Sequence, residues 1–242
     1  MSKTLNHRPI LWPAVWTLIC ISPNILAYDG EKKTEEFGVV VQAASDWIYD
    51  GTTETRGEPS IGINGEWRAQ PALFLGFEAH EANVRADRQR QRSISAYIGI
   101  DQSLGENWYT ALSLQHREFP GSIKEWDFTE VILQFAYLDN VSLSLDYSPN
   151  YYARGTKGFG GVLSYTRNIS RRTYWSAEVG SQQLSESRFV DYEYARLALG
   201  LSTSKLNIDI SYGWNSEDGN LLFGNEPLLS PELLLQVSYR IK

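Results

Sequence analysis

The feature that most constrains this chain is a two-residue alternation of apolar and polar side chains that recurs from residue 37 to the C-terminus. In the segment SISAYIGID (93–101), Ile94 and Ile98 share one face, and Ser95 and Asp101 lie on the other. Comparable segments lie at residues 37–47, 60–68, 72–80, 108–117, 128–138, 141–148, 158–166, 174–182, 193–202, 206–214 and 232–242. Because strand side chains alternate between two faces, the pattern predicts an all-β chain of about twelve strands.

Alternation leaves two kinds of fold open, because an apolar strand face can form a soluble core or contact lipid. The connections between the segments help to separate the two. Short connections lie at residues 69–71, 102–107, 138–140, 168–172 and 202–205, and longer ones at 48–59, 81–92, 118–127, 149–157, 183–191 and 215–231. Short and long connections alternate strictly, which favours an antiparallel up-and-down barrel with one short-turned rim and one long-looped rim over a Greek-key sandwich.

The tryptophans point in the same direction, because they lie near the ends of the predicted strands. After residue 27 they are Trp47, Trp67, Trp108, Trp126, Trp175 and Trp214, three beside short connections and three beside long ones. Indole rings gather at membrane–water interfaces, since the ring is apolar and its N–H needs a partner. The pattern predicts an aromatic girdle at each rim, with Trp47 at a membrane surface and residues 48–59 as the first external loop.

The charged residues of the predicted strands fall mainly on the polar faces. These candidate pore-lining residues are Glu66, Arg68, Glu78, Asp101, Arg117, Glu130, Asp146, Glu178, Arg196, Asp209 and Arg240. The apolar faces carry almost no charge, as lipid contact requires, because a cation at the bilayer midplane costs about 2–4 kcal/mol. We therefore predict a transmembrane β-barrel with a hydrated, mixed-charge interior.

The N-terminus has the features of a secretory signal peptide. A basic start with Lys3 and Arg8 precedes the uncharged apolar run 9–27, and the chain then turns polar. We predict cleavage after residue 27, a short periplasmic segment at 28–36 and an outer-membrane barrel at 37–242. Removing residues 1–27 takes away two basic residues and no acid, so the formal net charge moves from −7 to −9. It also removes the only cysteine, which excludes disulfides and cysteine chemistry.

The stretch SDWIYDGTTETRGEPSIGI (45–63) resembles the Ser-Asp-aromatic…Gly-x-Ser/Thr…Pro-Ala/Ser signature of the TorF family of porins, outer-membrane β-barrel proteins of Gram-negative bacteria. The matching positions are Ser45, Asp46, Trp47, Gly51, Thr53, Pro59 and Ser60. The family usually has Arg before the Gly, where this chain has Asp50, and EFPGSI (118–123) is similar to its Tyr-Pro-Gly turn. The resemblance implies an outer-membrane barrel that acts as a transport channel.

The expected function is passive diffusion of small hydrophilic solutes or ions, with a mild cation preference from the acidic excess on the polar faces. We expect no enzyme activity, cofactor or metal. Two alternatives stay open: a closed barrel with a structural or surface-binding role, and an outer-membrane hydrolase that uses His80 or His116. The sequence does not determine the oligomeric state.

One further partner is suggested by the arginine-rich segment EANVRADRQRQR (81–92). Its four basic residues are Arg85, Arg88, Arg90 and Arg92. Export and an acidic chain argue against nucleic acid as the partner. The segment is expected either to bridge lipopolysaccharide phosphates as an external loop or to be an ordinary solvated loop.

Overall fold

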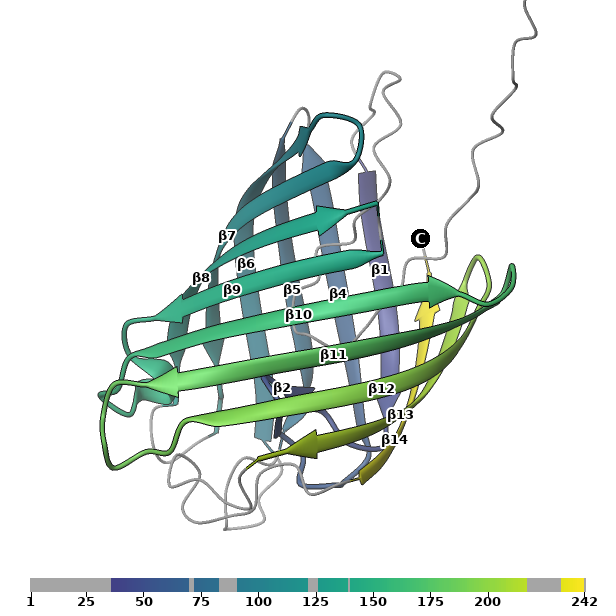
Figure 1. The fold of residues 1–242 in the computed structure, drawn as a ribbon. Helices are drawn as coiled ribbons and strands as arrows, with labels where there is room; N and C mark the ends of the chain where they lie inside the picture. The colour runs from purple at the N-terminus through teal and green to yellow at the C-terminus, as the bar shows by residue number, and fades with distance from the viewer. Residues whose placement is uncertain are drawn as a thin grey trace, which may run out of the picture.

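The structure is a computed structural model that describes residues 36–69, 72–82, 91–121, 126–138, 140–216 and 232–241. These residues form a closed antiparallel β-barrel of twelve strands (Figure 1). Its strands are β1 (Glu36–Ala44), β4 (Ser60–Ala69), β5 (Leu73–Ala82), β6 (Gln91–Leu104), β7 (Trp108–Glu118), β8 (Phe128–Tyr137), β9 (Val141–Ser148), β10 (Gly158–Asn168), β11 (Thr173–Leu184), β12 (Tyr192–Ser202), β13 (Leu206–Asn215) and β14 (Glu232–Arg240). The all-β barrel predicted from the alternation is confirmed. The predicted signal peptide and nearly all of segment 28–36 lie outside the described residues.

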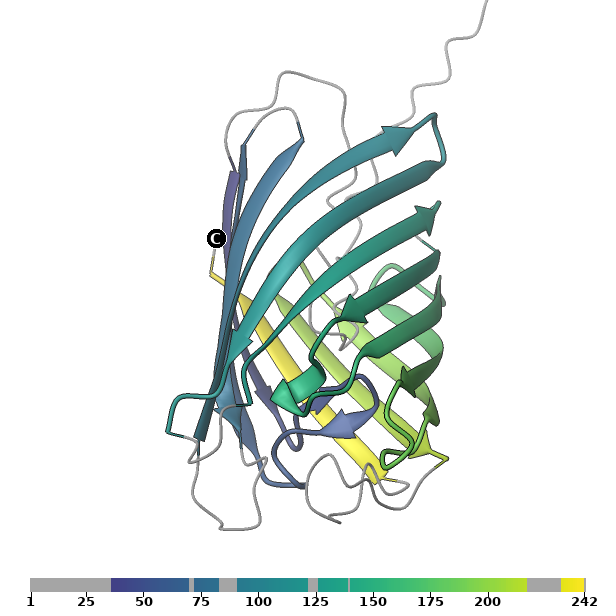
Figure 2. The same ribbon diagram turned by 90° about the vertical axis from the view of Figure 1, so that its left-hand side faces the viewer.

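Each strand pairs with its neighbour in the chain, and β1 pairs with β14 to close the barrel. In that closing pair Val40 lies opposite Arg240 and Ala44 opposite Gln236. Both β1 and β14 therefore have their outer ends at the short-turned rim, and the strand ends that the longer connections join lie at the opposite rim (Figure 2). Among the described residues, no helix is long and apolar enough to cross a membrane.

The distribution of apolar and polar side chains in this barrel is the reverse of that in a soluble barrel. On β6, the apolar side chains of Ile98 and Ile100 are 47% and 56% exposed, whereas the alternating Ser95 is only 2% exposed. The same pattern of exposed apolar and buried polar residues recurs around the wall. Because lipid rather than water suits such an outer surface, the burial pattern decides between the two folds that alternation left open.

The two predicted tryptophan girdles are only partly reproduced. Trp108 and Trp214 are exposed on the outside, but Trp47 and Trp126 are each only 3% exposed. The placement of these two at a lipid interface was wrong, because the chain segments that carry them turn into the barrel. Trp47 packs there on His80, and the Arg154 guanidinium covers the Trp126 ring at 4.3 Å. The other two tryptophans, Trp67 and Trp175, lie on the outward face of their strands.

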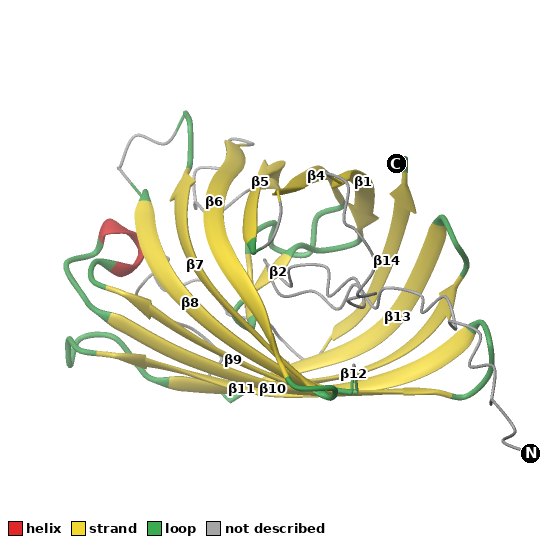
Figure 3. Ribbon diagram, turned by 90° about the horizontal axis from the view of Figure 1, so that it is seen from above, coloured by secondary structure: helices red, strands yellow, loops and turns green. Residues whose placement is uncertain are grey.

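The segment after β1 was expected to be an external loop, and this expectation was also wrong. Residues 45–59, which we call the inner loop, fold inside the ring of strands (Figure 3). They form a two-stranded hairpin, β2 (Ile48–Tyr49) and β3 (Thr52–Thr53). A short 3-10 helix, η1 (Tyr151–Ala153), packs against it from the connection between β9 and β10 (Figure 2). The long-looped half of the interior therefore contains chain as well as wall side chains.

Candidate functional site

The inner loop is held in shape by the side chain of Asp46. Its Oδ1 accepts hydrogen bonds from the hydroxyls of Thr53 and Thr55, at 2.6 and 2.5 Å. The Thr55 hydroxyl oxygen in turn accepts the backbone N–H of Trp47 at 2.9 Å, and the Glu54 N–H donates to the Trp47 carbonyl at 2.7 Å. Burial raises the pKa of Asp46 even though these hydrogen bonds oppose the rise. These short-range bonds make the inner loop a folded unit rather than an open connection.

The other matched positions of the family-like stretch anchor the two ends of the inner loop. The Ser45 N–H donates to the Leu235 carbonyl at 2.8 Å, and the Leu235 N–H donates back to the Ser45 hydroxyl at 3.0 Å. After Pro59, the Ser60 hydroxyl donates to the Glu81 carbonyl at 2.8 Å. Ser45, Asp46 and Ser60, three of the residues that carry the resemblance, thus hold the inner loop and its two ends by hydrogen bonds.

The tip of the inner loop is a two-residue turn made by Asp50 and Gly51. Both have positive φ, 47° and 71°, which is the conformation of a type I′ hairpin turn and the reason that Asp-Gly favours it. Asn215 of β13 donates to the Gly51 carbonyl at 2.9 Å, and the Tyr194 ring packs directly on Gly51. The turn therefore contacts the wall at β12 and β13. The Asp-Gly pair was the sequence signal for this hairpin, and sequence reasoning missed it.

Glu54 is the centre of a fully buried polar network. The Arg117 Nη1 donates to both of its carboxylate oxygens, at 3.1 and 3.2 Å, and Tyr152 donates to Oε1 at 3.2 Å. His80 is hydrogen-bonded to Oε2 and stacks on Trp47, with ring centroids 4.2 Å apart. Burial works to raise the pKa of Glu54, but the positive charges of Arg117 and His80 outweigh it and leave the pKa below its ordinary value. The network joins the inner loop to β5, β7 and η1.

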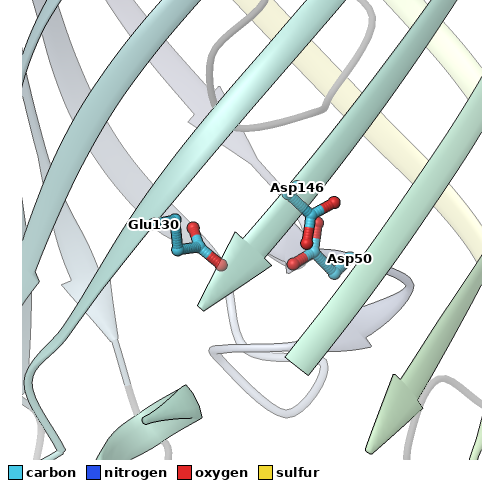
Figure 4. Close-up of side chains that lie close together, drawn as sticks. All are labelled: Asp50, Glu130 and Asp146. Atoms are coloured by element: carbon cyan, nitrogen blue, oxygen red, sulfur yellow. The ribbon is translucent and has the colours of Figure 1, made fainter. Parts of the chain in front are cut away.

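A second group of buried polar side chains lies next to the hairpin turn. The carboxylates of Asp50, Glu130 and Asp146 approach one another from the inner loop, β8 and β9 (Figure 4). Tyr49 donates a hydrogen bond to Glu130, and Tyr151 donates to Asp50 at 3.1 Å. Burial, together with the charges of Asp146 and Glu130, raises the pKa of Asp50 well above its ordinary value. Three acids from distant parts of the chain are thus concentrated in one buried place.

All eleven candidate pore-lining residues lie on the strand face that turns into the barrel. Near the short-turned rim, Arg68 makes ion pairs with Glu66 at 2.7 Å and with Asp101. Further along the wall, Arg196 pairs with Glu178 at 3.1 Å. The structure therefore brings several of these residues together as ion pairs along the wall, whereas others, such as Glu130 and Asp146, are in no ion pair with a basic group of the described residues.

Aromatic side chains fill much of the remaining space on the long-looped side. Phe128 is central: its ring centroid lies 4.5 Å from Tyr152 and 5.4 Å from Tyr151 of η1, and 6.2 Å from Tyr49 of the inner loop. The Trp126 ring meets Tyr152 edge to face at 6.3 Å. This buried cluster was not foreseen, because Tyr151 and Tyr152 lie in a connection with no strand alternation to place them.

The two candidate catalytic histidines lie on opposite sides of the wall. His80 is buried inside, between Glu54 and Glu78, whereas the side chain of His116 is half exposed on the outer face beside Glu118. The two cannot contribute to one active site. Of the arginine-rich segment, Arg85, Arg88 and Arg90 lie outside the described residues, and Arg92 lies on the outward face of β6.

The barrel resembles solved outer-membrane proteins. A KdgM porin superposes with a TM-score of 0.53 over 85% of this chain and 98% of that chain, at 9% identity. A KdgM porin in complex with disordered oligogalacturonate gives a TM-score of 0.54 over 86% of this chain and 99% of that chain, at 8% identity. The chain has the fold of an outer-membrane porin. No protein-family model matches it and no curated protein matches it, so membership of the TorF family stays a prediction.

Proposed function

We propose that this protein is an outer-membrane channel that passes small hydrophilic solutes or ions through a lumen narrowed by the inner loop. The observation that carries the proposal is the polarity of the wall, with apolar side chains outside and charged or hydrogen-bonding side chains inside. A barrel of this polarity suits lipid on one face and water on the other. The inner loop crosses that polar space and sets its narrowest part.

The charge of the interior supports a mild preference for cations. The eleven proposed lining residues comprise seven carboxylates and four arginines, and the inner loop adds four acids, Asp46, Asp50, Glu54 and Glu58, and one arginine, Arg56. An acidic excess inside a low-dielectric wall concentrates cations and repels anions. The same argument makes acidic saccharides poor solutes here, although one similar porin was solved with an oligogalacturonate.

The location in the outer membrane is part of the same proposal. The signal-like residues 1–27 are expected to direct export and to be removed, which mass spectrometry of the mature protein would test directly. The outward-facing Arg92, with Arg85, Arg88 and Arg90 beside it in the sequence, is proposed to contact lipopolysaccharide phosphates at the long-looped rim.

The experiment that tests the function is single-channel recording of the refolded protein in a planar lipid bilayer, with a salt gradient across it. Discrete conductance steps with a reversal potential on the cation side are expected. Asp209→Asn, which removes one interior charge, should move the reversal potential toward the neutral value. Refolded barrels that insert and stay silent would overturn the channel proposal.

A closed barrel is the second candidate, and the aromatic cluster is the observation that favours it. Phe128, Tyr151, Tyr152 and their neighbours occupy the long-looped half as densely packed apolar groups. If the wild-type barrel is silent and remains silent when the inner loop is shortened, a structural or surface-binding role replaces the channel.

A further inference from the structure

The cluster of Asp50, Glu130 and Asp146 differs from several other acidic groups of the interior, which have arginine partners. One ligand-capable oxygen from each residue lies within 4.8 Å of those of the other two, and all three side chains are buried. Elsewhere in the described interior, Glu54, Glu66 and Glu178 each have an arginine within ion-pair distance. No ion pair of the described residues neutralises the cluster, and the nearby Arg117 is held by Glu54.

Two of the carboxylate oxygens have no hydrogen-bond donor within bonding distance among the described residues. Glu130 is 1% exposed, and its Oε1 is buried without a hydrogen bond while Tyr49 donates to the other oxygen. Asp146 Oδ2 is likewise buried and unpartnered. Figure 4 shows the carboxylates directed toward one another from separate chain segments. Since an unsatisfied buried carboxylate oxygen carries a large desolvation penalty, these atoms point to a bound positive species.

The spacing and chemistry of the three groups indicate which species. The ligand set consists of oxygen atoms alone, which suits a hard divalent cation. Two oxygens bound to one Ca²⁺ at about 2.3–2.6 Å lie at most about 5 Å apart, whereas Mg²⁺ at about 2.0–2.1 Å limits them to about 4.2 Å. Separations within 4.8 Å fit the wider and more flexible coordination shell of Ca²⁺, and a buried site disfavours Mg²⁺, which usually keeps several of its waters.

We propose that Asp50, Glu130 and Asp146 form a Ca²⁺ site that fastens the tip of the inner loop to β8 and β9. Asp50 comes from the loop and the other two from the wall, so one ion would join the loop to the wall. The Asp-Gly turn presents Asp50 to the site, since the left-handed backbone at residues 50–51 aims its side chain away from β2 and β3.

The test is calorimetric titration of CaCl₂ into the refolded, chelator-treated full chain in detergent at neutral pH. One ion per chain is expected, with a dissociation constant of about 10⁻⁴–10⁻³ M, as in extracellular calcium modules, and with weaker Mg²⁺ binding. Glu130→Gln and Asp146→Asn should each weaken Ca²⁺ binding roughly tenfold or more. Asp209→Asn is the matched control, because Asp209 is an interior acid that hydrogen-bonds Tyr174 outside the cluster.

If a wall variant does not refold, Asp50→Asn replaces it, because Asp50 lies in the loop and outside the wall. A rise of the wild-type unfolding temperature with Ca²⁺ that disappears in Asp50→Asn supports the site. Folded wild-type protein that takes up no Ca²⁺, or variants that bind it as well as wild type, would overturn the proposal and leave protons as the neutralising species. Neither measurement requires conduction, so this outcome is independent of the channel experiment.

Discussion

The two halves of the barrel interior hold their charges in different ways. At the short-turned rim, Arg68 pairs with Glu66 of its own strand, β4, and with Asp101 of β6, which lies two strands along the wall. At the long-looped rim, the partners of Arg117 and His80 include Glu54, which arrives on a segment inserted from elsewhere. The first half is stabilised by neighbours in the sheet, whereas the second half depends on the inner loop. The interior thus combines a wall that folds as a sheet with a separate element that sets its width.

Shortening the inner loop is expected to have the largest effect, because it removes the element that distinguishes the long-looped half from the short-turned half. Replacing residues 48–53 by two glycines removes the hairpin and its contacts to β8, β12 and β13. Single-channel conductance should rise several-fold, because the segment that crosses the lumen is gone. The matched control shortens the connection 185–191, and unchanged conductance of the hairpin deletion would show that the inner loop does not narrow the path.

Removing one acid from each half of the interior should lower the free energy of unfolding by different amounts. Glu54→Gln removes the carboxylate that the fully buried Arg117 binds at 3.1 Å and leaves the longer contact with Glu78 at 4.0 Å; loss of the close partner of a buried pair costs about 3–5 kcal/mol. Glu66→Gln should cost only about 1 kcal/mol, because Arg68 is partly exposed and keeps its pair with Asp101. Reversible urea unfolding in lipid vesicles measures both, and equal losses would remove the distinction between the halves.

The pH dependence of stability should follow the same network. The pKa of Glu54 in the folded protein is below its unfolded value, so its contribution is complete above the unfolded pKa, about 4.3. That contribution falls away as the pH drops through the lower folded pKa. The difference in unfolding free energy between wild type and Glu54→Gln should therefore be constant near neutral pH and shrink in acid. A difference that grows in acid would contradict the assigned shift.

The smallest expected effect is a difference in tryptophan fluorescence quenching, which distinguishes side chains outside the wall from those inside it. Single-tryptophan variants that keep Trp108 should be quenched strongly by lipids brominated near the interface, because Trp108 is 51% exposed on the outer face. Variants that keep Trp126 should be quenched little, since its ring is covered by Arg154 inside the barrel. Similar quenching of both would place residue 126 at the lipid surface after all.

Much of the wall could be predicted from the sequence, because the information for it is local. Alternation along each segment, such as 93–101, determines which side chains share a face, and the order of short and long connections determines the two rims. The same alternation predicted which eleven charged residues lie on the polar faces, and all of them face inward. Neighbour-to-neighbour strand pairing needs no long-range information beyond closure by β1 and β14.

The interior site was decided by the tertiary structure alone. Asp-Gly at 50–51 signals a hairpin, but nothing near it in the sequence says that the hairpin enters the barrel. Glu54 contacts residues 26, 63 and 98 positions away, and Asp50 meets acids from two different strands. The sequence by itself determined a lipid-facing barrel with a polar interior, because strand periodicity is a local property. The direction of the inner loop, the burial of Trp47 and the meeting of three carboxylates depended on closure of the barrel, which alone brings those distant segments together.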